Sequence, residues 1–242
     1  MVWMALKESK MTKYNVGILV YDFMDLLDFA GPCEVLSLAA FSNLQQSIML
    51  YKRSLPKNKP FQVKTVSETG NLIKTHTGTL IQPDYNLDNA PRFDILIIPG
   101  GPLRAINKMK KNKKVIDYIV KSQNIEMICS VCSGSLILAE TGLLNSKTAT
   151  SHNLALSLLN NKSRGIQVVK DKKVVKDGNI ITSGGISSGV NMALYLIEKL
   201  VNKEIAQRTA KILEFSGYSE SEIMDIMEKD NFLAAQQDGV IK

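Results

Sequence analysis

Short apolar runs and longer amphipathic stretches alternate along most of this chain. Residues 15–21 and 93–98 are mostly apolar runs of strand length, and residues 126–130 predict a third strand. Such runs are typical of parallel strands that are buried on both faces of a sheet. Residues 25–38 and 113–122 carry apolar side chains at helical spacing instead. Strands that alternate with helices predict a mostly parallel sheet covered on both sides.

Shorter elements continue this pattern through the rest of the chain. Residues 62–66 predict a strand, followed by a hairpin around Thr77 and Gly78. Pro32 is expected in the first turn of its helix, where a missing N–H costs little. Residues 42–59 are polar and basic and predict a surface excursion. The other predicted strands are 147–150, 167–170, 174–175 and 180–182, and the other helices are 136–141, 153–159, 188–200 and 203–215.

The domain organisation predicted by this pattern is simple. Of the 242 residues, 45% are hydrophobic and 22% are charged, which is enough apolar material for a sizeable core. No linker or internal repeat divides the chain, so we expect one flavodoxin-like α/β domain over residues 11–216. Residues 1–10 are expected to be a disordered leader, and residues 217–242 a C-terminal tail.

Cysteine usage and hydropathy suggest a compartment. The three cysteines are Cys33, Cys129 and Cys132, an odd number without regular spacing. This argues against a secreted disulfide framework and for a reducing environment. No apolar run approaches the roughly 20 residues needed to cross a bilayer, and the N-terminal apolar stretch is too short for a signal peptide. We therefore expect a cytoplasmic protein without a membrane partner.

The formal net charge of +7 comes mostly from lysine, which clusters within residues 108–114 and 170–176. Nucleic-acid binding usually adds arginine or aromatic side chains that contact the bases. No aromatic residue interrupts the first cluster, and arginine is scarce. The clusters are better explained as a solvated helix end and a hairpin tip, so we expect no nucleic-acid partner.

Cys132 stands between the predicted strand 126–130 and the predicted helix 136–141, with small residues after it. Strand, tight turn, nucleophile and helix are the parts of a nucleophile elbow. A thiol at a helix N-terminus lies at the positive end of the helix dipole, which lowers its pKa and favours the thiolate. The alternative is a cysteine that only fills space as a small apolar residue.

Other candidates follow strands at the same predicted edge, where open α/β sheets bind their ligands. Gly100 and Gly101 come directly after residues 93–98. Their backbone N–H groups, with that of Ser133, predict an oxyanion-type hole. The alternative is that the two glycines only permit a turn.

Asp28 and His152 complete the candidate site. Asp28 lies between Leu27 and Phe29, so partial desolvation should raise its pKa and let it hold or pass a proton. Its alternative role is a helix N-cap. His152 follows another predicted strand and would assist Cys132 as a base, line the pocket, or serve as a hydrogen-bonded structural residue.

Cys129 and Cys132 form a C-x-x-C pair, which raises the question of zinc or redox chemistry. Cys129 lies inside a predicted strand, and a fourfold site would have to recruit Cys33, His76 or His152 from scattered places. We therefore expect no metal site.

Several segments, in order and spacing, resemble the DJ-1/PfpI superfamily: residues 93–101, 130–135, 150–152 and 181–189. The resemblance covers residues 15–215. Within the superfamily, the isocyanide hydratases are similar in further segments as well: residues 27–32, 141–144, 177–179 and 206–208. This resemblance implies that Cys132 is the nucleophile and Asp28 its acid/base partner, with Ser133 standing where the hydratases usually have threonine.

The resemblance also implies an activity. An isocyanide hydratase-like lyase would hydrate an organic isocyanide to an N-substituted formamide through a covalent thioimidate, with the Gly101 and Ser133 amides orienting the adduct. It would need no metal or organic cofactor, and it would be a homodimer packed near the active site. Two alternatives stay open. One is a glyoxalase or deglycase acting on α-oxoaldehydes, although those relatives carry glutamate where this chain has Asp28. The other is a non-catalytic redox sensor in which Cys132 oxidises to a sulfinate.

Overall fold

The computed structural model describes residues 12–51, 58–160, 164–185 and 187–226. The expected leader, residues 1–10, and residues 227–242 of the expected tail lie outside these ranges. No helix in the described part of the chain has the length and apolar character that a membrane span requires.

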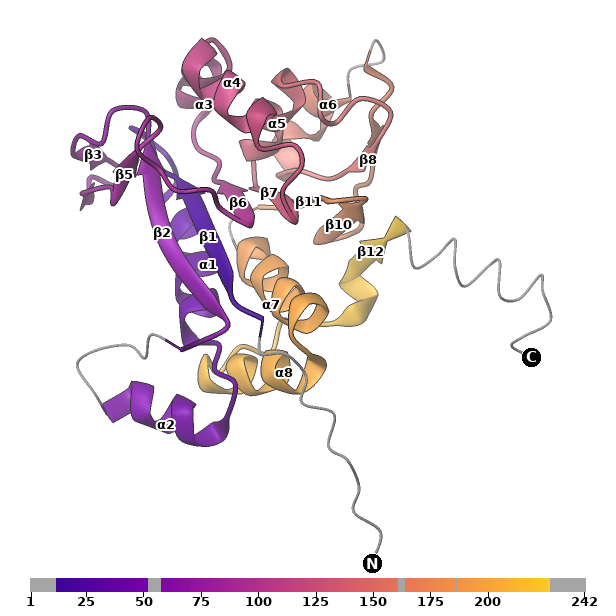
Figure 1. The fold of residues 1–242 in the computed structure, drawn as a ribbon. Helices are drawn as coiled ribbons and strands as arrows, with labels where there is room; N and C mark the ends of the chain where they lie inside the picture. The colour runs from indigo at the N-terminus through magenta and orange to yellow at the C-terminus, as the bar shows by residue number, and fades with distance from the viewer. Residues whose placement is uncertain (1–11, 52–57, 161–163, 186, 227–242) are drawn as a thin grey trace, which may run out of the picture.

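An eight-stranded sheet forms the centre of the molecule (Figure 1), in the order β12-β10-β11-β7-β6-β1-β2-β5. The strands β10 and β11 pair antiparallel, and the other neighbours run parallel. This confirms the predicted mostly parallel sheet. The strands are β1 (Tyr14–Leu19), β2 (Phe61–Ser67), β5 (Tyr85–Asn86), β6 (Ile95–Ile98), β7 (Met127–Val131), β10 (Val174–Asp177), β11 (Ile180–Ser183) and β12 (Ile223–Asp225).

Two short ladders lie outside this sheet. The strands β3 (Ile73–Lys74) and β4 (Leu80–Ile81) pair antiparallel around the hairpin predicted at Thr77 and Gly78. The strands β8 (Thr148–Ala149) and β9 (Gln167–Val168) pair with each other in parallel. The strands expected at residues 147–150 and 167–170 therefore exist but are shorter and do not join the central sheet.

Helices cover both faces of the sheet (Figure 1), as predicted. One face packs against α3–α6, and the other against α1, α7 and α8. The helices are α1 (Leu26–Leu38), α2 (Asn43–Tyr51), α3 (Leu103–Lys110), α4 (Lys113–Lys121), α5 (Gly134–Glu140), α6 (Leu156–Leu159), α7 (Ser188–Leu200) and α8 (Lys203–Ile212), with 3₁₀ turns η1 (Asn153–Ala155) and η3 (Glu220–Glu222).

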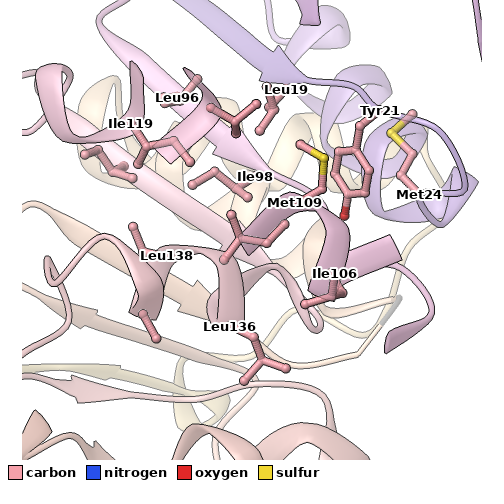
Figure 2. Close-up of a cluster of buried hydrophobic side chains, with 14 of the residues drawn as sticks. Leu19, Tyr21, Met24, Leu96, Ile98, Ile106, Met109, Ile119, Leu136 and Leu138 are labelled. Atoms are coloured by element: carbon pink, nitrogen blue, oxygen red, sulfur yellow. The ribbon is translucent and has the colours of Figure 1, made fainter. Parts of the chain in front are cut away.

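The strand β6 is apolar throughout because each of its faces meets a separate core. On β6, Leu96 and Ile98 belong to the core under α3–α5, whereas Ile95 and Ile97 belong to the core under α1 and α7. Figure 2 shows the first of these cores, in which Leu96 and Ile98 lie with Ile106 of α3. Side chains that alternate between two buried faces leave no polar position in the run.

The first helix departs from its expected form in one respect. Pro32 lies well inside α1 rather than in its first turn, because the helix already begins at Leu26. A proline has no N–H, so the carbonyl of Asp28 receives no bond from the residue four positions on. This break lies in the turn that carries the candidate acid.

The expected excursion at residues 42–59 is only partly a surface feature. It contains α2, on which Gln46 is buried, and it ends at Lys59, which is also buried. The Lys59 Nζ donates a hydrogen bond to the Ser37 carbonyl oxygen at 3.1 Å. Residues 52–57 lie outside the described residues. The ends of the segment are therefore fastened to the α/β body.

The sheet extends beyond residue 216, where the domain was expected to end. The strand β12 pairs with β10, and Asp225 holds it through Lys176 at 3.3 Å and the Tyr195 hydroxyl at 2.6 Å. Lys173 forms an ion pair with Glu222 at 3.8 Å. The lysine cluster at 170–176 is therefore a contact surface for the C-terminal segment, which corrects its interpretation as a solvated hairpin tip.

Gly134 offers a test of how closely α5 packs on the sheet. A Cβ at Gly134 would lie 2.3 Å from the Ile98 carbonyl oxygen and 2.8 Å from that of Pro99. These are backbone atoms at the end of a central strand and cannot swing aside. We predict that Gly134→Ala lowers the free energy of unfolding by about 2 kcal/mol or more in denaturant titrations.

The matched control is Gly31→Ala in α1. Its Cβ would meet a Val190 methyl group at 3.3 Å, a side-chain atom that can shift, and alanine is the better helix former. We expect its unfolding free energy to stay within about 1 kcal/mol of the wild type. If both substitutions changed the free energy of unfolding by the same small amount, the close packing of α5 would be contradicted.

Candidate active site

Three loops meet at the carboxyl ends of β1, β6 and β7. The chain pairs β1 with β2 on one side and with β6 on the other, so the strand order reverses between β1 and β6. Open α/β sheets bind ligands in the crevice at such a reversal. The segments that follow these strands carry Asp28 in the first turn of α1, Gly100 and Cys132 respectively. The fold therefore brings these predicted residues together.

Cys132 occupies a sharp turn between β7 and α5. Its φ of 57° lies in the left-handed region, which costs a non-glycine residue of order 1–3 kcal/mol and persists only where the surroundings hold it. Its N–H donates to the carbonyl oxygens of Ser183 at 3.1 Å and Gly184 at 3.0 Å. Its own carbonyl accepts the Ser151 hydroxyl at 3.0 Å. The predicted nucleophile-elbow geometry is present and is fixed at both ends.

The glycine pair after β6 connects the three loops. The Gly100 N–H donates to Asp28 Oδ2 at 2.9 Å, and the Gly101 N–H donates to Ser133 Oγ at 3.0 Å. The Ser133 hydroxyl donates back to the Gly101 carbonyl at 2.8 Å. A Cβ at Gly100 would lie 2.7 Å from the Ser133 nitrogen and 2.8 Å from Asp28 Oδ2. Only glycine fits this close approach.

These bonds correct the expected oxyanion-type hole. The Gly101 N–H, expected to face a reacting atom, is already donated to Ser133 Oγ. The Ser133 N–H forms its hydrogen bond with the Cys132 sulfur. The glycines therefore position the acid and the hydroxyl, and the amide beside the Cys132 sulfur is that of Ser133.

Asp28 is an isolated acid inside the protein. Its side chain is 0% exposed, and Oδ1 has no hydrogen-bond partner among the described residues. Asp28 lies within the first turn of α1, whereas the N-cap position belongs to Asp25. Burial, and next the charge of Asp25, raise the pKa of Asp28 to about 7, against hydrogen bonds from Gly100 and Cys132. Asp28 can therefore both hold and release a proton near neutral pH.

Cys132 does not have the lowered pKa that its helix position predicts. The residue is only 5% exposed. Burial first, and then the charge of Asp28, raise the pKa of the thiol to about 12, although both hydrogen bonds from Ser133 lower it. The expectation of a resting thiolate was wrong, because desolvation and a neighbouring carboxylate outweigh a short helix dipole.

Asp25 is a site residue that the sequence argument missed. One ligand atom each from Asp25, Asp28 and Cys132 lie within 4.8 Å of one another. Burial raises the pKa of Asp25, and the neighbouring imidazoles of His76 and His152 oppose this. The available signal was the spacing of three residues at the start of a predicted helix, which places Asp25 and Asp28 on one face.

A cleft of about 270 Å³ opens over Cys132 and is lined by Asp25, Ser133 and His152, with Leu103 and Leu154 as apolar walls. His152 Nδ1 accepts the Leu154 N–H at 3.2 Å and caps the turn η1. The proton of the neutral ring therefore resides on Nε2. His152 accordingly lines the cleft as a hydrogen-bond donor, not as the base of Cys132.

The cluster of Asp25, Asp28 and Cys132 is compact enough for one cation to contact all three. Metal ligands must be deprotonated to bind. Here burial raises the pKa of each of the three groups, so they favour protons over a cation. The arrangement is better suited to moving protons beside a sulfur.

Known proteins resemble this chain over most of its length. The model of the DJ-1/PfpI family matches residues 15–199. The chain is 31% identical to an isonitrile hydratase from Pseudomonas putida over 203 residues, which cover 84% of this chain and 78% of that protein. It is 35% identical to protein dj-1beta of Drosophila melanogaster over 147 residues, 59% of this chain and 75% of that protein. The crystal structure of a ThiJ/PfpI family protein from Pseudomonas syringae shares the fold, with a TM-score of 0.72 and 24% identity over 91% of this chain and 84% of that one.

The buried acid predicts a pH-dependent loss of stability. An aspartate ionises near 3.8 in the unfolded chain, whereas the pKa of Asp28 is raised to about 7 when folded. Stability is therefore lost as pH rises from about 4 to about 7. We predict that Asp28→Asn raises the free energy of unfolding at pH 8 by up to about 4 kcal/mol. The thermal unfolding temperature should therefore be higher at pH 8 and unchanged below pH 4.

The control is Asp88→Asn, which changes an exposed acid outside the cleft. Differential scanning calorimetry should show the same midpoint for this variant and the wild type at both pH values. A lower midpoint for Asp28→Asn at pH 8 would mean that the Gly100 bond stabilises the charged acid more than burial destabilises it.

Proposed function

The chain belongs to the DJ-1/PfpI family, and from this membership we propose that it is a hydratase that converts organic isocyanides to N-substituted formamides, with Cys132 as the nucleophile. The observation that carries the proposal is the arrangement of a thiol beside an acid whose pKa is about 7, beneath a cleft with apolar walls. The similarity to an isonitrile hydratase over most of both chains supports the same reaction.

The first step adds S–H across the terminal carbon of the isocyanide. Asp28 as carboxylate accepts the thiol proton while the sulfur bonds to that carbon, and the carbon then takes the proton from Asp28. The product is a thioimidate, R–N=CH–S–Cys132, and Asp28 returns to its carboxylate form. The Ser133 N–H, which lies beside the sulfur, stabilises negative charge on it during attack. Covalent catalysis of this kind divides one difficult addition into two easier steps.

The shape and charge of the cleft suit this substrate. Isocyanides are uncharged, and the alkyl or aryl group of such a molecule can lie against Leu103 and Leu154 at the cleft walls. A redox sensor instead needs an accessible, low-pKa thiol, and Cys132 is buried with a raised pKa. These observations favour catalysis over sensing.

We also propose that the chain is a homodimer, as its family resemblance implies. Exposed apolar side chains on two joined segments support this: Phe23, Leu72 and Leu80 are 56%, 54% and 59% exposed. The Phe23 N–H donates to the Lys74 carbonyl, which joins the β1–α1 loop to the β3–β4 hairpin. Light scattering should give twice the chain mass of 26.8 kDa, and Leu80→Lys should lower it towards one chain. A monomeric wild type would contradict the proposal.

The activity is tested with purified, reduced protein and cyclohexyl isocyanide, following formamide by chromatography. We expect turnover that Cys132→Ser abolishes and that Asp28→Asn reduces by about 10²-fold or more. Because Asp28 acts as carboxylate, kcat/KM should rise with pH through about 7 and then level off. Cys33→Ser is the matched control, since this half-buried thiol lies on α1 outside the cleft.

The contradicting result is equally specific. Folded protein with reduced Cys132 that converts none of several alkyl and aryl isocyanides would remove the hydratase assignment. Consumption of methylglyoxal that is lost in Cys132→Ala would assign the same site to α-oxoaldehydes instead.

A further inference from the structure

The two acids beside Cys132 differ in their access to water. Asp28 is 0% exposed and does not line the cleft. Asp25 is half-buried and forms part of the cleft wall. Both have a carboxylate oxygen within 4.8 Å of the sulfur. A water molecule that enters the cleft therefore meets Asp25 before it can meet Asp28.

The hydration proposed above needs a second proton acceptor at this place. After the thioimidate forms, a water molecule must lose a proton while its oxygen bonds to the same carbon. His152 Nδ1 already accepts the Leu154 N–H, so the neutral ring presents a donor. The Ser133 hydroxyl donates its hydrogen bond to the Gly101 carbonyl oxygen. Among the polar side chains that line the described cleft, Asp25 is the one that offers an acceptor.

The local bonding leaves the Asp25 carboxylate available. The residue is fixed through its backbone, because its N–H donates to the Gly100 carbonyl at 3.0 Å. Although it occupies the N-cap position of α1, its side chain makes no capping hydrogen bond. The carboxylate of an N-cap aspartate ordinarily accepts hydrogen bonds from the first backbone amides of the helix. Here the backbone is held and the carboxylate is not used in this way.

We propose that Asp25 is a second catalytic residue, the general base that activates the water for hydrolysis of the thioimidate on Cys132. This inference rests on the proposed hydratase function and deepens it. Asp28 serves the formation of the thioimidate, and Asp25 serves its resolution.

The second half of the reaction then balances. Asp25 accepts a proton from water as the water oxygen bonds to the thioimidate carbon and the C=N electron pair moves to nitrogen. That proton passes to the nitrogen, giving R–NH–CH(OH)–S–Cys132. The remaining hydroxyl proton moves to the departing sulfur as the C–S bond breaks. The products are the N-substituted formamide and the free thiol, and both carboxylates are restored.

Five titratable groups surround Asp25, and one of them is Tyr21 in the loop after β1. Asp28 and Cys132 lie beside it on the protein side, and the two histidines of the chain, His76 and His152, interact with it from the β3–β4 hairpin and from the loop after β8. The negative charge of Asp25 in turn raises the pKa of Asp28. Removing that charge should move the ionisation of Asp28 to lower pH.

The test separates the two steps in single turnovers. Full-length reduced protein in excess is mixed with cyclohexyl isocyanide and quenched at intervals, and intact mass reports the adduct on Cys132. In Asp25→Asn we expect the adduct to form within about 3-fold of the wild-type rate. Its decay should slow by up to about 100-fold, which is within the range of general-base catalysis. Asp25→Glu should decay faster than Asp25→Asn. Asp88→Asn should match the wild type.

A second readout is the pH profile of adduct formation. Its rise should shift to lower pH in Asp25→Asn, because Asp28 loses a neighbouring negative charge. Asparagine is itself a favoured N-cap residue, so this variant should fold, as circular dichroism can verify.

The outcomes distinguish the two proposals. Adduct that forms and decays equally fast in Asp25→Asn and the wild type overturns the role of Asp25 alone. Formation and decay that slow by the same factor overturn it too, since that pattern belongs to a structural defect. A wild type that forms neither adduct nor formamide removes the hydratase function and this inference with it.

Discussion

The site depends on one constraint, the close approach of the turn after β6 to the loops on either side of it. Gly100 forms a hydrogen bond with Asp28 at the start of α1, and Gly101 forms two with Ser133, the residue after Cys132. Since a Cβ at Gly100 would overlap both neighbours, the approach fixes the distance between acid and sulfur before any substrate arrives. Groups that are held in reactive geometry in advance do not have to be ordered during the reaction. The short, strongly buried β6 supplies the rigid base for this turn.

The same constraint explains why the site is a source of instability. Holding Asp28 against Gly100 places a carboxyl where water does not reach, and only one of its two oxygens has a hydrogen-bond partner among the described residues. Burial then raises the pKa of the acid, and the acid in turn raises that of the thiol. A strained residue at Cys132 adds to this cost. Functional sites commonly lower stability in this way, and the two packed cores on either face of the sheet offset the loss.

The sequence predicts what depends on local pattern. The uninterrupted apolar run at β6 identifies a buried parallel strand, and the small residues after Cys132 identify its turn, because both follow from neighbours in the chain. The pairing of β12 could not be predicted in this way: a strand of three residues carries little periodicity, and it is held by Lys176 and Tyr195 from distant parts of the chain. The position of Asp25 beside Asp28 and the raised pKa of Cys132 were missed for the same reason. Both depend on burial and on charges that only the folded chain brings together.

A raised thiol pKa is compatible with the chemistry proposed for Cys132. Addition to an isocyanide carbon requires a proton at that carbon as well as a bond to sulfur. A thiol that keeps its proton until Asp28 can accept it supplies both the sulfur and the proton that add to the carbon. A permanently ionised sulfur would have to obtain that proton from solvent, and it would also be open to oxidants. The burial that keeps Cys132 protonated therefore limits its reactions to those in which a partner beside it accepts the proton at the moment of attack.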